Sequence, residues 1–226
     1  MTPPTPRAAL LDVDGTLIDS NDAHARAWVD AFAEFGYDVP FEEVRPLVGM
    51  GGDKLVRRLV DLDTELGRGK ELTGRRMEIF RERYVDHLHA FPKARELMER
   101  MRRDGLTLVI ATSARQDEFE ALMRSAGLDG IVDAHTTSDD ADDSKPDPDI
   151  VAAALEESGC SADRAIMLGD TPYDVEAAGR AGVRVVALRC GGWGDAELEG
   201  AIAIYDDPAD LLERYDGSPF ARDGAR

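Results

Sequence analysis

Cysteine and histidine are scarce in this 226-residue sequence, which contains two cysteines and four histidines. Cys160 and Cys190 do not form a CxxC pair, so the sequence indicates neither a zinc site of the usual spacing nor a disulfide framework. A chain that does without disulfides suits a reducing compartment. We therefore expect a cytoplasmic protein.

Positive charge is also in short supply, because 27 Lys and Arg face 46 Asp and Glu and give a net charge of -19. Nucleic acids and anionic membranes bind basic surfaces, so neither is expected as a partner. The longest apolar runs, at 8–11 and 183–188, are too short to cross a bilayer, and residues 1–7 lack the pattern of a signal peptide. An anionic substrate would need a local cation to reverse the field at its site.

The sequence contains 43% hydrophobic and 32% charged residues, which is enough hydrophobic residues to form a buried core. After Phe91, short apolar runs alternate with helical patterns, which predicts a parallel sheet covered on both faces, a doubly wound, Rossmann-like α/β fold. The expected strands are 8–13, 106–111, 131–136, 165–168, 183–188 and a short one at 201–204. The expected helices of this part are 95–103, 115–126, 149–158, 172–181 and 209–213.

The segment before Phe91 has a different character. Residues 20–35 show helical spacing of apolar positions, and 41–89 carry further helical patterns broken by glycines, with no run typical of a strand. We therefore predict a core of residues 1–18 and 91–226, and an inserted all-helical cap of residues 19–90.

Polar side chains cluster where the predicted strands end. Asp12 and Asp14 follow the first strand, Thr112 and Ser113 the second, and Asp170 and Asp174 the fourth, while Lys145 lies in the loop after the third. The carboxyl ends of parallel strands share one edge of a sheet, and ligands bind there. The sequence thus predicts that these residues meet in one site.

The residue types indicate phosphoryl transfer assisted by a metal. Asp12 and Asp14 are two positions apart, so an extended chain brings both carboxylates to one side, where their charges need a cation nearby. Hard oxygen ligands with room for water and phosphate suit Mg²⁺. One carboxylate could then be a nucleophile and the other an acid and base, while Lys145 and Thr112 bind phosphoryl oxygens.

Four segments resemble the motifs of one family. Asp12-Val13-Asp14-Gly15-Thr16-Leu17-Ile18-Asp19 is similar to the first motif of the haloacid dehalogenase superfamily, and Thr112 stands where the second has Ser or Thr. Ser144-Lys145-Pro146 resembles the third motif, and Gly169-Asp170-Thr171-Pro172-Tyr173-Asp174 the fourth. All occur in the family's order between Ala8 and Leu188. The resemblance is strongest to the branch of phosphoglycolate phosphatases and β-phosphoglucomutases, which have a helical cap.

The resemblance implies a Mg²⁺-dependent phosphoric monoester hydrolase that acts on a small phosphorylated metabolite. Asp12 would form an aspartyl-phosphate, and Asp14 would protonate the leaving oxygen and then activate water. The metal residues would be Asp12, Asp14 through its backbone carbonyl, Asp170 and, near or behind them, Asp174. Thr112 and Lys145 would hold the phosphate. The residues that we expect to contact substrate are Thr16, Ser113, His24, Gly51 and Lys54. The cap would close about hinges near 17–18 and 91–92.

Departures from the family pattern narrow the chemistry. Haloacid dehalogenases proper lack the second aspartate, and phosphonoacetaldehyde hydrolases usually have alanine there, so Asp14 argues against both. His24, with Trp28 one turn further along the helix, resembles a cap-hinge histidine of the mutases. A sugar-phosphate mutase is therefore an alternative function. Packing of His24 and Trp28 against the cap would also explain the pair. The loop 49–54 lacks the arginine of the mutases and favours a phosphatase. A catalytically idle binding module is a third interpretation, against which the full set of motifs speaks.

Some of these residues have local structural interpretations as well. Ser113 and Gln116 have capping-box spacing, so Ser113 is expected to cap the next helix. Asp147 before Pro148 is expected to cap the helix of 149–158. Asp174 lies at a helix start and fits either capping or support of a metal. The sequence indicates neither the physiological substrate nor the oligomeric state.

Overall fold

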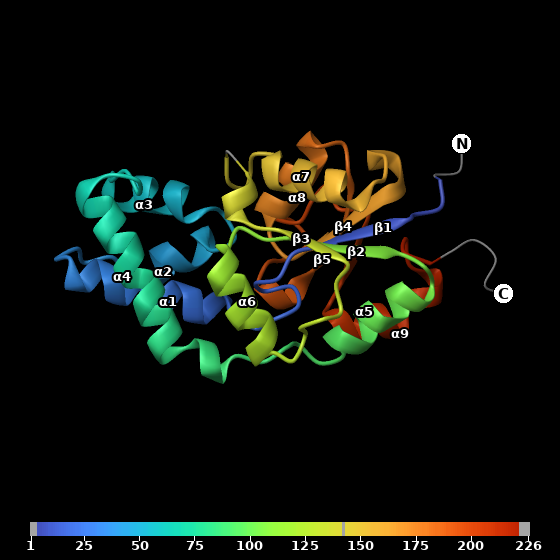
Figure 1. Cartoon of the computed structure of the whole chain (residues 1–226), viewed down its shortest axis with the longest axis horizontal. Coiled ribbons are helices and arrows are strands. Elements are labelled where there is room, and N and C mark those ends of the chain that lie inside the picture. Colours follow the sequence, from blue (N-terminus) through green and yellow to red (C-terminus); the bar gives the residue numbers. More distant parts are fainter. Residues whose placement is uncertain (1–3, 142, 222–226) are drawn as a thin grey trace.

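The computed structural model describes residues 4–221 except 142, and it has two parts that lie side by side (Figure 1). One part contains a sheet with helices on both faces, and the other contains helices only. The strands are β1 (Ala8–Leu11), β2 (Thr107–Ala111), β3 (Ala134–Thr136), β4 (Ala165–Gly169), β5 (Arg184–Leu188) and β6 (Ala203–Tyr205). The helices are α1 (Asn21–Glu34), α2 (Phe41–Val44), α3 (Gly52–Val60), α4 (Gly67–Arg83), α5 (Ala94–Arg103), α6 (Gln116–Ser125), α7 (Asp149–Ser158), α8 (Pro172–Arg180) and α9 (Pro208–Glu213).

The sheet is parallel throughout, with strand order β3-β2-β1-β4-β5-β6. The chain therefore starts in the middle of the sheet and winds first to one edge and then to the other. The loops that leave β1 and β4 lie next to each other, at the point where the winding reverses. Such a switch point is where ligands bind in open α/β sheets, and the predicted doubly wound fold is confirmed.

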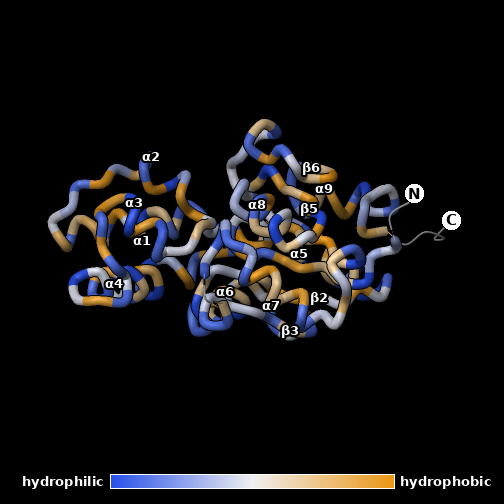
Figure 2. Tube along the Cα trace, turned by 90° about the horizontal axis from the view of Figure 1, so that it is seen from above, coloured by the Kyte–Doolittle hydropathy of each residue, from blue (hydrophilic) through white to orange (hydrophobic). Residues whose placement is uncertain are grey.

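Both faces of the central strand β1 are buried. Ala9 and Leu11 pack into one core together with residues of α5, α6 and α9, and Ala8 and Leu10 pack into a second core under α7 and α8. In Figure 1, α7 and α8 lie on one side of the sheet and α5 and α9 on the other. Figure 2 shows hydrophobic segments running through the middle of this part. Continuous apolar runs are expected for strands covered on both faces.

The helical part consists of α1 to α4 and has a core of its own, which includes Trp28, Phe32, Leu55 and Leu72. Two chain crossings join it to the sheet, and they pair with each other. Ile18 forms an antiparallel bridge with Ala90, and the amides of Asp19 and Phe91 donate to the carbonyls of His89 and Leu17. The boundaries that we predicted at 18/19 and 90/91 fall within this paired crossing. We refer to α1–α4 with their loops as the cap helices.

The predicted strands differ from the observed ones at their ends, by two or three residues in the first, third and last. The first ends at Leu11 and not at residue 13. The third is not 131–136 but Ala134–Thr136, because Ile131 is buried in the core as part of a loop and the Asp133 carboxylate accepts from the Leu108 amide. The last is shifted to Ala203–Tyr205. The sequence of residues 1–7 predicts a short disordered arm before the first strand, and its first three residues lie outside the described residues. Within the described part of the chain, no helix combines the length and the apolar character that a membrane crossing requires.

Candidate active site

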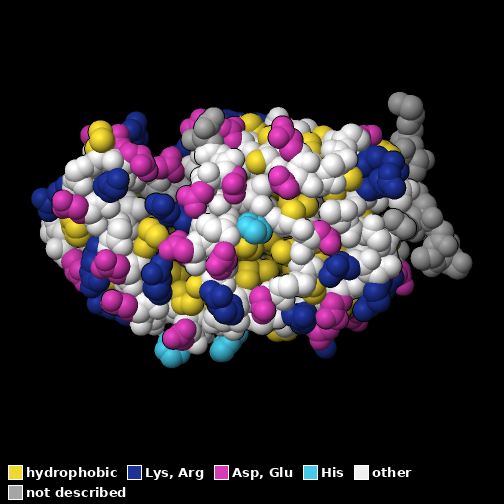
Figure 3. All heavy atoms as spheres, in the orientation of Figure 1, with side chains coloured by type: hydrophobic (Ala, Val, Ile, Leu, Met, Phe, Trp, Pro, Cys, Tyr) yellow, Lys and Arg dark blue, Asp and Glu magenta, His cyan; other side chains and the backbone are white. Residues whose placement is uncertain are grey.

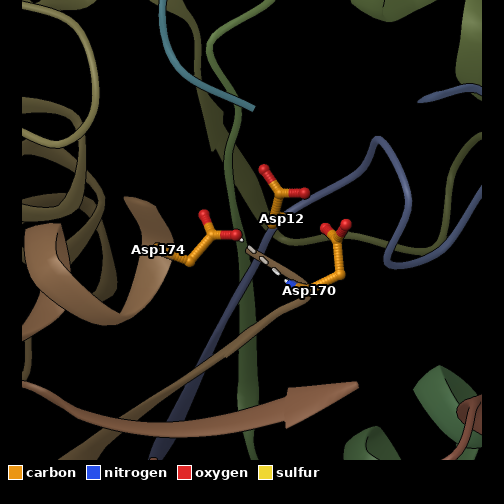
Figure 4. A group of neighbouring side chains, drawn as sticks. All are labelled: Asp12, Asp170 and Asp174. Carbon is orange, nitrogen blue, oxygen red and sulfur yellow. Dashed lines mark hydrogen bonds between the residues drawn. The ribbon is translucent and has the colours of Figure 1, made fainter. Parts of the chain in front are cut away.

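Three carboxylates meet at the switch point of the sheet (Figure 4). Asp12 follows β1, Asp170 follows β4, and Asp174 comes from the first turn of α8. One carboxylate oxygen of each lies within 4.8 Å of the other two, and all three residues are buried. The structure thus brings together Asp12 with two residues that are more than 150 positions away in the sequence.

Lys145 reaches the same point from the loop before α7. Its buried ammonium lies 2.6 Å from Oδ1 of Asp12 and 2.8 Å from Oδ1 of Asp174, and it donates to the Ala111 carbonyl at 2.9 Å. Burial by itself lowers the pKa of Lys145, but the charges of Asp12 and Asp174 outweigh it and hold that pKa above its ordinary value. Lys145 is therefore a permanent cation between two of the three carboxylates.

One lysine does not balance the three acids. Burial raises the pKa of Asp12 to about 7 even though Lys145 opposes the shift. Burial and the charges of Asp12 and Asp174 also raise the pKa of Asp170 well above its ordinary value. Asp170 has no Lys, Arg or His within ion-pair distance among residues 4–221 without 142. A buried, all-oxygen donor set whose negative charge exceeds that of its one lysine suits a divalent cation such as Mg²⁺.

Neutral groups hold Asp170 in place. The Thr16 hydroxyl lies 2.8 Å from Oδ1 of Asp170 and 3.2 Å from Oδ2 of Asp12. The side-chain amide of Asn21, the first residue of α1, donates to Oδ2 of Asp170 at 3.0 Å. Gly191 lies directly behind, where a Cβ atom would be 1.7 Å from that same oxygen. Thr16, predicted to contact substrate, thus lies against the carboxylates and is fully buried.

Asp14 turns away from this cluster and toward the cap helices. Its Oδ1 accepts from the Ser20 hydroxyl at 2.5 Å and lies 2.6 Å from Nε2 of His24. Arg76 contacts Nδ1 of His24, and because an arginine can only donate, Nε2 carries the hydrogen directed at Asp14. Burial raises the pKa of Asp14, but His24, Ser20 and the Arg76 charge outweigh it, so the net pKa lies below its ordinary value. His24 therefore does more than pack, although it also stacks on Phe80 with ring centroids 4.1 Å apart.

Thr112 and Ser113 follow β2 and line the same cavity as Asp12. The Thr112 oxygen accepts from the Ala114 amide at 3.1 Å, which leaves its hydroxyl hydrogen available. The predicted capping by Ser113 is wrong, because the first amide of α6, that of Gln116, donates instead to Asp139 from the loop after β3. The Ser113 hydroxyl is buried and has no partner among the described residues.

The loops before α7 and α8 differ in how they begin their helices. Thr171 and Asp174 form a capping box at the start of α8, with Oδ2 of Asp174 accepting from the Thr171 amide at 3.0 Å. The predicted capping by Asp174 is therefore confirmed. Its Oδ1 contacts Lys145, and the support of a metal by this residue stays a prediction. The predicted capping by Asp147 is wrong, because its carboxylate contacts Lys54 and Arg180.

The glycine-rich cap loop lies against the core. A Cβ on Gly51 would be 2.0 Å from Ser144, and one on Gly49 would be 2.6 Å from the Thr171 methyl, so the missing side chains permit close packing. Gly51 also lines the cavity. Lys54 does not, because its ammonium contacts the Ser144 carbonyl and lies 2.6 Å from Asp147. Of the two predicted substrate residues in this loop, only Gly51 faces the cavity.

A cavity of about 710 Å³ lies between the cap helices and the sheet. Asp12, Asp14 and Thr112 form part of its wall on the core side. His24, Trp28 and residues of α4 form part of its wall on the cap side, with side chains of the loop 138–144 at another border. The carboxylates of Asp12 and Asp14 thus face a space large enough for a small metabolite.

Sequence reasoning missed several residues of this site, Ser20 and Gly191 among them. Asn21 holds Asp170, and Arg76 of α4 forms a buried ion pair with Glu118 of α6 at 2.6 Å. Arg76 and Glu118 are two of many charged residues on amphipathic helices, and nothing in their spacing sets them apart. Only their burial, at 7% and 8% exposed, distinguishes them.

Comparison with known proteins shows which family the chain resembles. The family model of haloacid dehalogenase-like hydrolases matches residues 9–188. A phosphoglycolate phosphatase of Rhodospirillum rubrum is 32% identical over 218 residues, covering 91% of this chain and 89% of that protein. The chloroplastic protein SUPPRESSOR OF QUENCHING 1 of Arabidopsis thaliana is 31% identical over 80% of this chain, but the match spans only 18% of that protein.

Solved structures show the same fold over nearly the whole chain. A hydrolase from Pseudomonas syringae has a TM-score of 0.86 and 30% identity, covering 93% of this chain and 98% of the other. A protein of Bacteroides vulgatus, named as a candidate β-phosphoglucomutase, has a TM-score of 0.82 and 25% identity, covering 94% and 88%.

The chain belongs to the haloacid dehalogenase-like hydrolases, as the four motifs predicted. Its enzyme class within that family is phosphoric monoester hydrolase.

Proposed function

We propose that this enzyme is a magnesium-dependent phosphatase that hydrolyses a small phosphorylated metabolite through an aspartyl-phosphate on Asp12. The convergence of Asp12, Asp170 and Asp174, with Asp12 in the wall of the cavity between the cap helices and the sheet, is the observation that carries this proposal. The relatives named phosphoglycolate phosphatase support phosphate ester hydrolysis as the reaction class.

The first step transfers the phosphoryl group to the enzyme. A carboxylate oxygen of Asp12 forms a bond to phosphorus as the bond from phosphorus to the ester oxygen breaks. Asp14 supplies the proton that this leaving oxygen takes up. Thr112, whose hydroxyl hydrogen is free, and the Lys145 ammonium bind the phosphoryl oxygens.

The second step returns the enzyme to its starting state. Asp14, now a carboxylate, accepts a proton from a water molecule as its oxygen attacks phosphorus, and the bond to Asp12 breaks. Inorganic phosphate leaves. Hydrogen bonds from Ser20 and His24 keep Asp14 pointing at the cavity and favour its ionised form, which suits the base of this step.

Asp12, Asp170 and Asp174 are the side chains that would hold Mg²⁺, and we assign the Asp14 backbone carbonyl as a further ligand from the family motif. When bound, the ion would neutralise phosphoryl charge and keep Asp12 ionised at neutral pH. Thr16 and Asn21 hold the Asp170 carboxylate in its orientation toward Asp12 and Asp174. In this proposal they position a metal ligand and do not bind the substrate.

The cap helices complete the site from the other side. They contribute His24 and Trp28 to the cavity wall, and the two paired crossings at residues 17–19 and 89–91 are where we propose that the cap moves. Closure excludes bulk water while the leaving group is still present. Lys54 fixes the cap loop to the loop before α7 and is a positioning residue in this proposal.

Phosphate release tests the proposal. The wild type with Mg²⁺ is assayed against p-nitrophenyl phosphate and a panel of metabolite phosphates, next to the Asp12→Asn variant and a control, Asp86→Asn, at an exposed position far along the chain. We expect the control to keep its activity. The rate of phosphate release by Asp12→Asn should fall at least about 1,000-fold, the loss typical of a missing nucleophile. Acid-quenched wild type should retain label from a radiolabelled phosphate ester, and Asp12→Asn should not. An active Asp12→Asn variant would refute the covalent route.

A sugar-phosphate mutase is the second candidate. The contact between His24 and Asp14 favours it, because a histidine on the cap that holds the acid and base could favour return of the phosphoryl group to a sugar hydroxyl over its transfer to water. Phosphorus NMR of the products separates the two reactions. Inorganic phosphate identifies the phosphatase, and an isomeric sugar phosphate identifies the mutase.

A further inference from the structure

A buried ion pair joins the cap helices to the core inside the cavity. Nη1 of Arg76, on α4, lies 2.6 Å from Oε2 of Glu118, on α6, and both residues line the cavity. Arg76 is 7% and Glu118 8% exposed. The pair therefore lies where the leaving group of a substrate bound at Asp12 would extend.

The guanidinium of Arg76 has little capacity left for another anion. Nη1 donates to Glu118 and Nη2 to His24, while Nε has no partner among the described residues but is buried out of reach of solvent. The rings of Trp28 and Phe80 lie 5.2 Å and 4.9 Å from its central carbon. Glu118 thus neutralises Arg76 and the aromatic rings hold it still.

The rest of the charged lining on this side is mostly acidic. Among the described residues, the cavity is lined by Lys70, Arg76 and Arg115. Lys70 and Arg115 are exposed at its border, and Arg76 is buried. Four exposed acids share that border, namely Asp53, Glu65, Asp139 and Asp143. Figure 3 shows acidic side chains, interspersed with basic ones, on both the cap helices and the core. A second anionic group on the substrate would enter a negative field with no free buried cation to receive it.

We propose that Glu118 determines substrate specificity by occupying Arg76, so that the enzyme selects phosphate monoesters with an uncharged, hydroxyl-bearing leaving group over those with a carboxylate. This inference rests on the proposed phosphatase function and narrows its substrate class. It also separates this chain from its relatives named for phosphoglycolate, because the leaving group of that substrate, glycolate, carries a carboxylate.

A matched pair of substrates tests the charge alone. Glycerol 3-phosphate and 3-phosphoglycerate share a carbon skeleton and differ by a hydroxymethyl group in place of a carboxylate. We expect wild-type kcat/KM with Mg²⁺ to favour glycerol 3-phosphate by at least about tenfold, equivalent to about 1.4 kcal/mol. Equal values, or a preference for 3-phosphoglycerate, would overturn the proposal.

Variants assign the preference to the ion pair. Glu118→Gln keeps the shape but frees the Arg76 charge, so the ratio should move at least about tenfold toward 3-phosphoglycerate. Arg76→Gln leaves Glu118 unpaired and should move the ratio the other way. Glu120→Gln, on the exposed side of α6, is the matched control and should leave the ratio unchanged. Any effect through His24 and Asp14 alters both substrates alike, so the ratio isolates the charge.

The possible outcomes distinguish a failure of the specificity proposal from a failure of the proposed phosphatase function. If folded wild type releases no phosphate from p-nitrophenyl phosphate or from either substrate, the phosphatase function fails and the specificity proposal with it. If it hydrolyses p-nitrophenyl phosphate but shows no preference within the pair, only the specificity proposal fails. If Glu118→Gln does not give a folded protein in a thermal melt, the opposite shift in Arg76→Gln decides, and an unchanged ratio there refutes the role of the pair.

Discussion

Replacing Gly191 by alanine should disable the site without touching a catalytic group. Gly191 follows β5, and its missing side chain leaves room for Asp170. A Cβ there would lie 1.7 Å from Oδ2 of Asp170 and 2.6 Å from its Cβ. Because the overlap includes the Asp170 Cβ atom, turning the Asp170 side chain does not relieve it.

The distances give the size of the effect. A Cβ atom essentially never comes closer than 3.0 Å to another heavy atom, so Oδ2 of Asp170 must move from 1.7 Å to at least 3.0 Å, a shift of about 1.3 Å. Overpacking of this kind costs about 1–3 kcal/mol of unfolding free energy. A misplacement of about 1 Å at a reacting centre can cost about 100-fold in rate. The Gly191 carbonyl also accepts from Arg45 at 2.8 Å, so the shift extends to the cap helices.

Two measurements check this prediction. Phosphate release from p-nitrophenyl phosphate with Mg²⁺ should fall about 100-fold in Gly191→Ala, and its melting temperature should drop by several degrees. The control is Gly217→Ala, because nothing lies within 4 Å of a Cβ at that position. If Gly191→Ala keeps its activity within about threefold and melts like the wild type, the close approach of Gly191 to Asp170 does not shape the site.

Three further predictions concern the charges of the site. Because burial raises the pKa of Asp12 from 3.8 to about 7, its stabilising contribution is complete below pH 3.8 and is lost as the pH rises through about 7. Denaturant unfolding in EDTA should therefore show this loss in the wild type and not in Asp12→Asn, and equal pH profiles would contradict it. Lys145→Met leaves the carboxylates of Asp12 and Asp174 without their cation and should cost about 3–5 kcal/mol, measured by the same unfolding assay. Added Mg²⁺ should recover part of this loss, and an unchanged midpoint without metal would speak against the buried pair. Ser20→Ala removes a hydrogen bond to Asp14 and should lower kcat about tenfold at nearly constant melting temperature, whereas an unchanged kcat would show that His24 alone orients Asp14.

Much of the fold could be predicted because its signals are local. The periodicity of apolar residues marked the helices and strands, and Gly36, Gly127 and Gly182 marked the ends of α1, α6 and α8. The ends of β3 were misjudged because burial of Ile131 and the bond from Asp133 to Leu108 come from packing between distant segments. Capping by Ser113 was wrong for the same reason, since Asp139 of another loop takes that place.

The residues of the candidate site likewise fall into those that local sequence signals predicted and those that only tertiary contacts revealed. Sequence alone determined that Asp12, Asp14, Thr112, Lys145 and Asp170 follow strand ends, because strand direction and topology then place them at one edge of the sheet. Tertiary structure alone decided that Asn21 and Gly191 fix Asp170, and that Arg76 and Glu118 form a pair inside the cavity. Such contacts join residues from separate elements and depend on distances of a few ångströms, which a pattern along one chain segment does not encode.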